Sequence, residues 1–289
     1  MNFGLCEQRR MLPELKCLQG KMQSYAEVRR FEDTADRLVP FRFGNEETSA
    51  MACVTVVGLG PGPLALMTKQ AEQCLLSADK VFIRTSAYPA YGWLQGLGKT
   101  LVAFDSLYAL PWPNADDLYD FMVSALLKEA SLRHSVTYAL PGSPSVLEDT
   151  TRKLKARGRA AGVEIRIVQG LSFVEPILAA VDFDFSLGLQ IVLPRTHLKE
   201  GLFDPRIAML VCQLNAKARP DDPPQVDRTV DWLLAAYPAN HDVTLIWTAG
   251  LPAYDILQAS LRLDEVVGAH GDDKYFSSLF VPPLMSRNR

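Results

Sequence analysis

The chain has 289 residues, 48% of them hydrophobic and 22% charged, and a formal net charge of −3. This length suits one large domain or two of medium size. The slightly negative balance lacks the basic field of most nucleic-acid-binding surfaces. No apolar run approaches the roughly 20 residues that cross a bilayer, and no signal-peptide pattern opens the chain. We therefore expect a cytoplasmic protein that binds neither nucleic acid nor membrane.

The chain carries no obvious metal-binding or disulfide pattern. Its five cysteines are scattered without a C-x-x-C pair, as reduced cytoplasmic thiols would be. The four histidines are isolated in polar segments. The paired acids in "DDLYD" fit the start of a helix, where the dipole favours negative charge, and those in "DFDF" fit a turn. We expect no metal site.

Residues 1–50 differ from the rest of the chain. Charges of both signs are mixed there, alternation is weak, and a single helix is expected from about Leu12 to Arg37. We treat this part as an N-terminal extension of unknown role.

From residue 51 a regular alternation of strands and helices begins. The expected strands are "ACVTVVG", "KVFIR", "TLVAF", "SVTYAL" and "VEIRIV", with helices between them at about 66–78, 91–97, 115–133 and 146–161. Short β-branched strands that alternate with helices predict a parallel sheet covered by helices on both faces. We assign residues 51–169 to this α/β subdomain.

The rhythm changes after Gly170. A helix in "SFVEPILAAV" is followed by strands in "GLQIVL" and "RIAMLVCQL", a helix at 227–237, and a strand in "DVTLIWTA". The last segments, "DILQASLRLDEVV" and "YFSSLFVPPL", alternate as antiparallel strands do. Residues 170–289 are therefore a second α/β subdomain with a mixed sheet, and the expected ligand site is a cleft between the two.

The first strand runs into a glycine–proline loop in "VTVVGLGPGPLALMT". A dinucleotide fingerprint, G-x-G-x-x-G, would need a third glycine where Pro63 stands. Pro61 and Pro63 also lack the N–H groups that cradle a phosphate. The loop suits close backbone approach, either in a tight turn without a ligand or around a group less charged than a pyrophosphate.

Three further loops, "LPGSPSV", "VQGLSFVEP" and "WTAGLPAY", also follow strands. Open α/β sheets bind their ligands at the carboxyl ends of the strands. Four such loops without an acid–base constellation indicate a site lined by backbone and small side chains. That lining suits an uncharged or zwitterionic adenosine compound.

These four motifs, in this order and spacing over about residues 52–284, resemble the S-adenosylmethionine-dependent tetrapyrrole (corrin/porphyrin) methylase superfamily. "PGSP" is in the style of its G-x-P motif and "VQGLSFVEPILAAV" resembles its P-G-x-S segment. With "FDPRIAMLVCQL", the chain looks most like the methylase-like domain that precedes MazG-type nucleotide pyrophosphohydrolases in some bacteria. We expect no hydrolase domain after "SLFVPPL".

The resemblance implies a two-domain fold, S-adenosylmethionine in the cleft, and a homodimer. Ser143 stands where many members have Asp, which leaves the usual tetrapyrrole specificity open. Transferred to this chain, the cofactor-binding positions are Gly60, Pro61 and Gly62; Gly142, Ser143 and Val146; Ser172 and Phe173; Cys212 or Gln213; and Ala249 or Gly250.

Methyl transfer from a sulfonium needs no proton donor for the leaving group, so positioning can supply most of the acceleration. If the acceptor must lose a proton, the candidate bases are Asp105, Tyr108 and Glu175, each of which could instead cap a helix or bond at the surface.

Two functions remain open. The first is a methyltransferase acting on a tetrapyrrole or another planar or extended acceptor. The second is a non-catalytic or cofactor-sensing module that partners a nucleotide pyrophosphohydrolase. A dinucleotide oxidoreductase is disfavoured because the fingerprint fails.

Overall fold

The computed structural model describes residues 52–133, 135–194, 203–214, 225–247, 256–270 and 277–284. The chain divides into a unit Met1–Phe43 and a unit Gly44–Arg289, and all described residues belong to the second. The expected helix of the N-terminal extension lies outside the described residues, as do Ala249 and Gly250. Among the described helices, none is both long and apolar enough to cross a membrane.

The first sheet is entirely parallel, as the alternation of strands and helices predicts. Its strands lie in the order β3-β2-β4-β1-β5, so β1 is flanked by β4 and β5. Their bounds are β1 (Cys53–Gly58), β2 (Lys80–Ile83), β3 (Thr100–Ala103), β4 (Ser135–Leu140) and β5 (Glu164–Val168).

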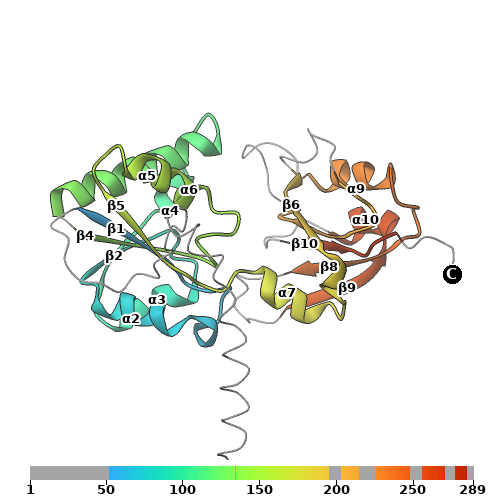
Figure 1. Ribbon diagram of the computed structural model, residues 1–289, viewed down its shortest axis with the longest axis horizontal. Helices are drawn as coiled ribbons and strands as arrows, with labels where there is room; N and C mark the ends of the chain where they lie inside the picture. The colour runs from blue at the N-terminus through green and yellow to red at the C-terminus, as the bar shows by residue number, and fades with distance from the viewer. Residues whose placement is uncertain are drawn as a thin grey trace, which may run out of the picture. The chain divides into compact units, whose positions relative to one another are not determined.

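Helices cover both faces of this sheet (Figure 1), with α5 and α6 on one side and α2 and α3 on the other. Successive residues of β1 face opposite layers. Val54 and Val56 pack with Leu126 of α5, whereas Val57 packs with Leu75 of α2. The helical elements are η3 (Leu64–Leu66), α2 (Lys69–Ser77), α3 (Pro89–Gly96), α4 (Asp105–Tyr108), α5 (Ala115–Arg133) and α6 (Asp149–Gly158).

Local capping explains where several of these helices begin. The Thr68 side chain accepts a hydrogen bond from the backbone nitrogen of Ala71 and caps α2. The Glu148 side chain does the same for Thr150 at the start of α6. The predicted acidic start of α5 is present, with Asp116 in its first turn, and the structure adds Arg133 in its last turn.

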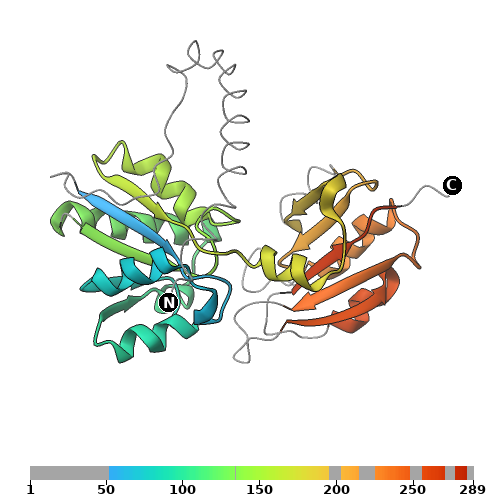
Figure 2. The same ribbon diagram turned by 60° about the horizontal axis from the view of Figure 1, so that its bottom comes forward.

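The second sheet is mixed, as predicted, and has the strand order β6-β7-β10-β8-β9 (Figure 2). Strands β6 and β7 are parallel, and the remaining pairs are antiparallel. Its elements are α7 (Val174–Ala180), η4 (Phe185–Leu187), β6 (Leu189–Val192), β7 (Ala208–Cys212), α9 (Val226–Leu234), β8 (Asp242–Trp247), β9 (Leu257–Arg262), η5 (Leu263–Glu265), α10 (Val266–His270) and β10 (Ser277–Val281).

One predicted strand is too long. The segment "DILQASLRLDEVV" was expected to be extended throughout, but β9 ends at Arg262 and a helical turn follows. The Glu265 carboxylate accepts from the backbone nitrogen of Arg262, which caps this turn. Leu263 and Val266, three positions apart, are both buried, and this helical spacing overrides the period-two alternation.

The core beside α5 yields a stability prediction. Leu126 is fully buried between this helix and the sheet, so Leu126→Ala should lower the free energy of unfolding by about 2–5 kcal/mol. Leu132 lies on the same helix but is 69% exposed, so Leu132→Ala should change it by less than about 0.5 kcal/mol. Urea denaturation of both variants checks this, and equal losses would contradict the packing described for α5.

Candidate functional site

The loops that follow β1 and β4 are joined directly by their backbones. Gly60 N donates to Gly142 O at 3.2 Å, and Gly142 N donates to Gly60 O at 2.7 Å. Both glycines have positive φ, +81° at Gly60 and +70° at Gly142, where side chains other than those of glycine are strained. The first two sequence motifs therefore form one structural unit.

The loop after β5 approaches the same point so closely that no side chain fits. A Cβ on Gly58 would lie 2.6 Å from Gly170 N and 2.7 Å from Gly142 O. A Cβ on Gly170 would lie 2.5 Å from Gly142 O. Three strand ends, those of β1, β4 and β5, thus meet through glycine backbones. By contrast, a Cβ on Gly142 would meet no described residue within 4 Å, so in the described part of the chain open space adjoins this junction.

Three side chains that sequence reasoning missed hold the glycine loops in place. The buried Tyr88 donates its hydroxyl hydrogen bond to Gly60 O. Thr68 Oγ1 donates to Gln169 O at 3.0 Å. The Gln169 amide bonds both serines of the second motif, accepting from Ser143 Oγ at 3.3 Å and donating to Ser145 Oγ at 2.9 Å. Gln169 directly precedes Gly170 and Thr68 ends the first motif, so their positions were the available signal, although the sequence does not indicate which loops they bond.

The other candidate cofactor-binding residues of the first two motifs are buried or half-buried. Pro61, Gly62 and Ser143 are buried, and Val146 is half-buried. Val146 packs, as Phe173 does, against the apolar cluster that contains Ile177 of α7. These positions supply backbone and small or apolar surface, as the sequence motifs predict.

The third motif forms a reciprocal cap at the start of α7. Ser172 Oγ accepts from Val174 N at 3.1 Å, and the Glu175 carboxylate accepts from Ser172 N at 2.8 Å and also from the Ser172 hydroxyl. This S-x-x-E arrangement satisfies the free N–H groups of a helix start. Glu175, a candidate base, therefore uses Oε2 in the cap.

The other two candidate bases lie beyond the end of β3, in α4. Asp105 accepts from Thr85 Oγ1 at 2.7 Å and from Ser86 N at 2.7 Å. Partial burial works to raise its pKa, but these bonds outweigh burial and hold the pKa below the ordinary value for Asp. Tyr108 accepts from Arg84 Nε, yet burial of its hydroxyl dominates and raises its pKa. Neither residue is among those that contact the glycine junction.

At the end of β7 in the second sheet, the two predicted residues Cys212 and Gln213 differ in burial and in backbone conformation. Cys212 is fully buried, and burial raises its pKa to about 12, so its thiol is inert. Gln213 has φ +57°, a left-handed conformation that is uncommon for this residue type. Such conformations concentrate at functional sites, which makes Gln213 the stronger candidate of the pair. Ala249 and Gly250 are outside the described part of the chain.

In the described ranges, no three His, Cys, Asp or Glu side chains gather closely enough to hold a metal ion. The glycine junction offers backbone donors and acceptors and an open space, and none of the described residues that bond at it is strongly basic or acidic. Such a site can hold and orient a ligand; it is not equipped for proton transfer by an acid–base pair.

Comparison with known proteins connects this geometry to a family. The sequence profile of "Tetrapyrrole (Corrin/Porphyrin) Methylases" matches residues 53–264. The uncharacterized protein YabN of Bacillus subtilis is 27% identical over 232 residues. That match covers 80% of this chain and 45% of YabN, so the chain spans less than half the length of this relative.

Two solved structures share the fold. The cobalt precorrin-4 methyltransferase CbiF has a TM-score of 0.60 and 14% identity, with 83% of this chain and 98% of that chain covered. The uroporphyrin-III C-methyltransferase of Thermus thermophilus, complexed with S-adenyl homocysteine, has a TM-score of 0.55 and 17% identity, with 79% and 96% covered. The predicted two-domain fold of this superfamily is confirmed.

The close approach at the glycine junction predicts that a single added methyl group lowers the stability of the fold. Gly170→Ala forces a Cβ against Gly142 O and should lower the free energy of unfolding by about 1–3 kcal/mol. Gly92 of α3 has open space around its Cβ position, so Gly92→Ala should be neutral or stabilise by up to about 1 kcal/mol. Chemical denaturation of both variants tests this, and equal stability of the two would contradict the close approach.

The hydrogen bonds of Asp105 predict a pH dependence. Because its pKa is lowered in the folded state, its stabilising contribution is complete above the ordinary pKa of Asp, about 3.9, and is lost as the pH falls through the lowered value. Thr85→Val removes one donor and should shift the titration of Asp105 upward. A carboxyl-carbon NMR titration measures both proteins, and an unchanged midpoint in the variant would contradict the role of Thr85.

Proposed function

Because the chain belongs to the tetrapyrrole (corrin/porphyrin) methylase family, we propose that it is an S-adenosylmethionine-dependent methyltransferase. The observation that carries this proposal is the junction of Gly58, Gly60, Gly142 and Gly170. It presents backbone groups beside an open space at the carboxyl ends of parallel strands, where α/β sheets bind ligands. The uroporphyrin-III C-methyltransferase with a bound S-adenosylmethionine product has the same fold, which supports the choice of donor.

The residues at the junction fit such a donor. A Cβ at Gly142 would enter the open space, so glycine keeps that space available to a ligand. Loops rich in backbone polar groups and free of charge suit a zwitterion better than a pyrophosphate. The residues that would hold the donor are Gly60, Pro61 and Gly62; Gly142, Ser143 and Val146; Ser172 and Phe173; Gln213 or Cys212; and Ala249 or Gly250.

When bound, the donor supplies a methyl group on a sulfonium whose leaving group departs neutral. The chain's own contribution is then orientation. The paired backbone bonds of Gly60 and Gly142, held by Tyr88 and Gln169, fix two walls of the site before any ligand arrives. Preorganised positioning of this kind can contribute roughly 7–11 kcal/mol to a transfer reaction. Catalysis by positioning agrees with the bonds of the three candidate bases, since Asp105, Tyr108 and Glu175 bond to residues outside the paired glycines.

We assign the acceptor to the tetrapyrroles or to another planar or extended compound, in a cytoplasmic homodimer. Ser143 donates to Gln169 instead of providing the carboxylate found in many members at this position. The donor therefore meets a neutral wall at Ser143.

A cofactor-sensing module is the second candidate. It is favoured by the match to YabN, because more than half of that protein lies outside the aligned part. On this view the chain binds the same donor but transfers nothing, and acts beside a nucleotide pyrophosphohydrolase. Conversion of the donor to S-adenosylhomocysteine in the presence of tetrapyrrole acceptors separates the two candidates.

A matched pair of variants tests the donor site. Gly142 and Gly98 share a φ of +70° and open space at the Cβ position, but only Gly142 belongs to the junction. Asn tolerates this conformation, so Gly142→Asn and Gly98→Asn should change stability similarly. Calorimetric titration with S-adenosylhomocysteine should show binding that Gly142→Asn weakens by about tenfold or more, equivalent to about 1.4 kcal/mol.

The Gly98→Asn variant should bind as the unaltered chain does. If the unaltered chain shows no binding, or if both variants bind equally well, the proposed donor site is wrong.

A further inference from the structure

A buried cation lies at the same sheet edge as the glycine junction. Arg84 directly follows β2, and its backbone nitrogen donates to Ala139 O at 2.9 Å. Gly58 pairs in register with Leu140, the next residue of β4. Arg84 and Gly58 therefore flank β4 at the same level, about 10 Å apart by the spacing of neighbouring strands. The Arg84 side chain is only 14% exposed.

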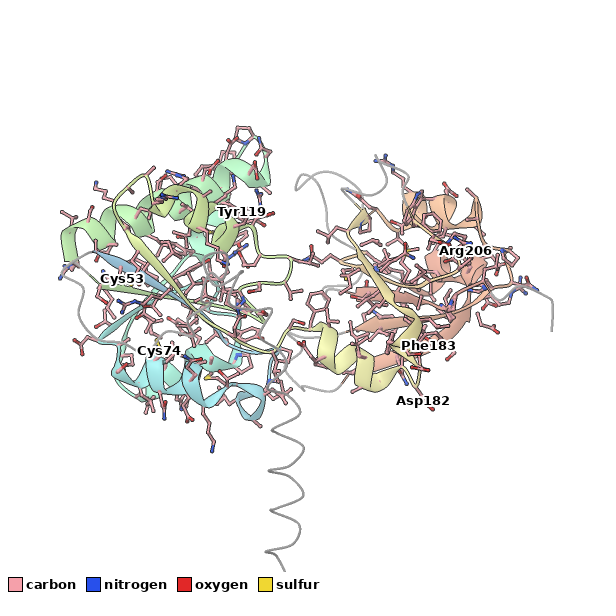
Figure 3. All side chains as sticks on the ribbon, viewed as in Figure 1. Cys53, Cys74, Tyr119, Asp182, Phe183 and Arg206 are labelled. Atoms are coloured by element: carbon pink, nitrogen blue, oxygen red, sulfur yellow. The ribbon has the colours of Figure 1, made fainter. Side chains whose placement is uncertain are left out.

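The guanidinium of Arg84 is held by residues from four elements. Nε donates to the Tyr108 hydroxyl of α4. Nη1 donates to Glu148 Oε1 at 2.8 Å, with Thr150 Oγ1 at 3.4 Å and Tyr138 Oη at 3.5 Å. The ring of Tyr119, from α5 and labelled in Figure 3, lies 4.7 Å from the guanidinium carbon. The cation is thus fixed in position before any ligand binds.

One nitrogen of the Arg84 guanidinium, Nη2, has no hydrogen-bond acceptor among the described residues. An arginine has five N–H donors and can bind a carboxylate through two parallel bonds. Here Glu148 receives Arg84 on Oε1, the oxygen that also accepts from Thr150 N at 3.0 Å and from Thr150 Oγ1 at 2.5 Å. No described residue accepts a hydrogen bond from Nη2. Among the described residues, the two hydrogens of Nη2 therefore have no acceptor.

Apolar and aromatic side chains follow Tyr108, the residue of α4 that contacts Arg84. Tyr108 is 46% exposed and Leu110 is 49% exposed, both in or just after α4. Trp112 and Phe121 follow, with ring centroids 5.4 Å apart, and Phe121 is also 49% exposed. The Trp112 indole donates to Leu107 O at 2.6 Å, which ties this surface to α4. A fixed cation beside exposed rings matches a ligand with a negative group on an apolar body.

We propose that Arg84 is an acceptor-binding residue whose Nη2 group holds an oxyanion, a carboxylate or a phosphate, carried on an aromatic or otherwise apolar molecule. As an acceptor site this rests on the proposed methyltransferase function; as an oxyanion site it does not. Glu148, Tyr108 and Tyr138 are positioning residues that orient the guanidinium.

Fluorine NMR titration of the full chain at constant ionic strength tests the site, with three probes. 4-Fluorobenzoate and 4-fluorobenzamide have the same shape but differ in charge, and 4-fluorophenyl phosphate distinguishes the two oxyanions. The dissociation constant of benzoate, of phosphate, or of both should be about ten- to hundredfold lower than that of the amide, as expected for hydrogen bonds to charged groups.

Arg84→Gln should abolish this preference. Arg84→Lys keeps the positive charge beside Glu148, so it replaces the glutamine variant in the test if that variant does not fold. It should reduce the preference for the anion, because lysine lacks the planar fork of N–H donors. Arg206→Gln is the control, since Arg206 in the second sheet's subdomain is 81% exposed and paired with Asp204 (Figure 3). This control should keep the full preference.

No preference for either anion in the unaltered chain would overturn the oxyanion site. So would a preference that survives in both Arg84 variants or disappears in Arg206→Gln.

Calorimetry with S-adenosylhomocysteine separates the two proposals. Donor binding without an anion preference overturns the Arg84 site alone, whereas an anion preference without donor binding supports the oxyanion site and overturns the proposed function.

Discussion

The structure depends on the close approach of three strand ends, which meet at glycine residues. Strand β1 lies between β4 and β5, and the chain leaves all three strands at the same edge. At Gly58 and Gly170 the backbones are so close that a single Cβ would lie 2.5–2.7 Å from neighbouring backbone atoms. Close-packed interiors do not absorb such an overlap without displacing the strands. Glycine at these positions is therefore a condition for the loops to meet.

The polar side chains around this contact support the backbone. Tyr88 bonds Gly60 O, Thr68 bonds Gln169 O, and the Gln169 amide joins Ser143 to Ser145. These bonds link α2, α3 and three loops into one frame. A frame of this kind suits a reaction that needs alignment more than proton transfer, because a methyl group moves in line from a leaving group that stays neutral.

The sheet edge has a second, chemically different part. Around β1, β4 and β5 it is neutral and made of backbone, whereas at the end of β2 it holds the buried guanidinium of Arg84. Burial opposes this charge, but Tyr138 and Glu148 outweigh it, and the pKa of Arg84 lies well above its ordinary value. The cation therefore persists at any physiological pH. One edge thus offers a neutral wall, which suits the proposed donor, and a fixed positive group, which suits the proposed anionic acceptor.

The sequence by itself determined the elements whose cause is local. Period-two alternation and β-branched residues specify the strands of the first sheet, and the glycine and proline motifs mark the loops at their ends. The S-x-x-E pattern at Ser172 specifies a helix start, although the bonds by which Ser172 and Glu175 cap α7 are visible only in the structure. Locally, "LRLDEVV" also satisfies both strand and helix periods, and the burial of Leu263 and Val266 decided between them.

Tertiary structure alone decided which distant residues meet. The hydrogen-bond partners of Arg84 lie between 24 and 66 residues away, on α4, β4 and α6. No sequence period links them, because their proximity follows from the strand order, which places β4 between β1 and β2. For the same reason the sequence does not show that Tyr88 and Gln169 bond to the glycine loops. Local spacing encodes the elements, whereas the site arises where a parallel sheet brings their ends together.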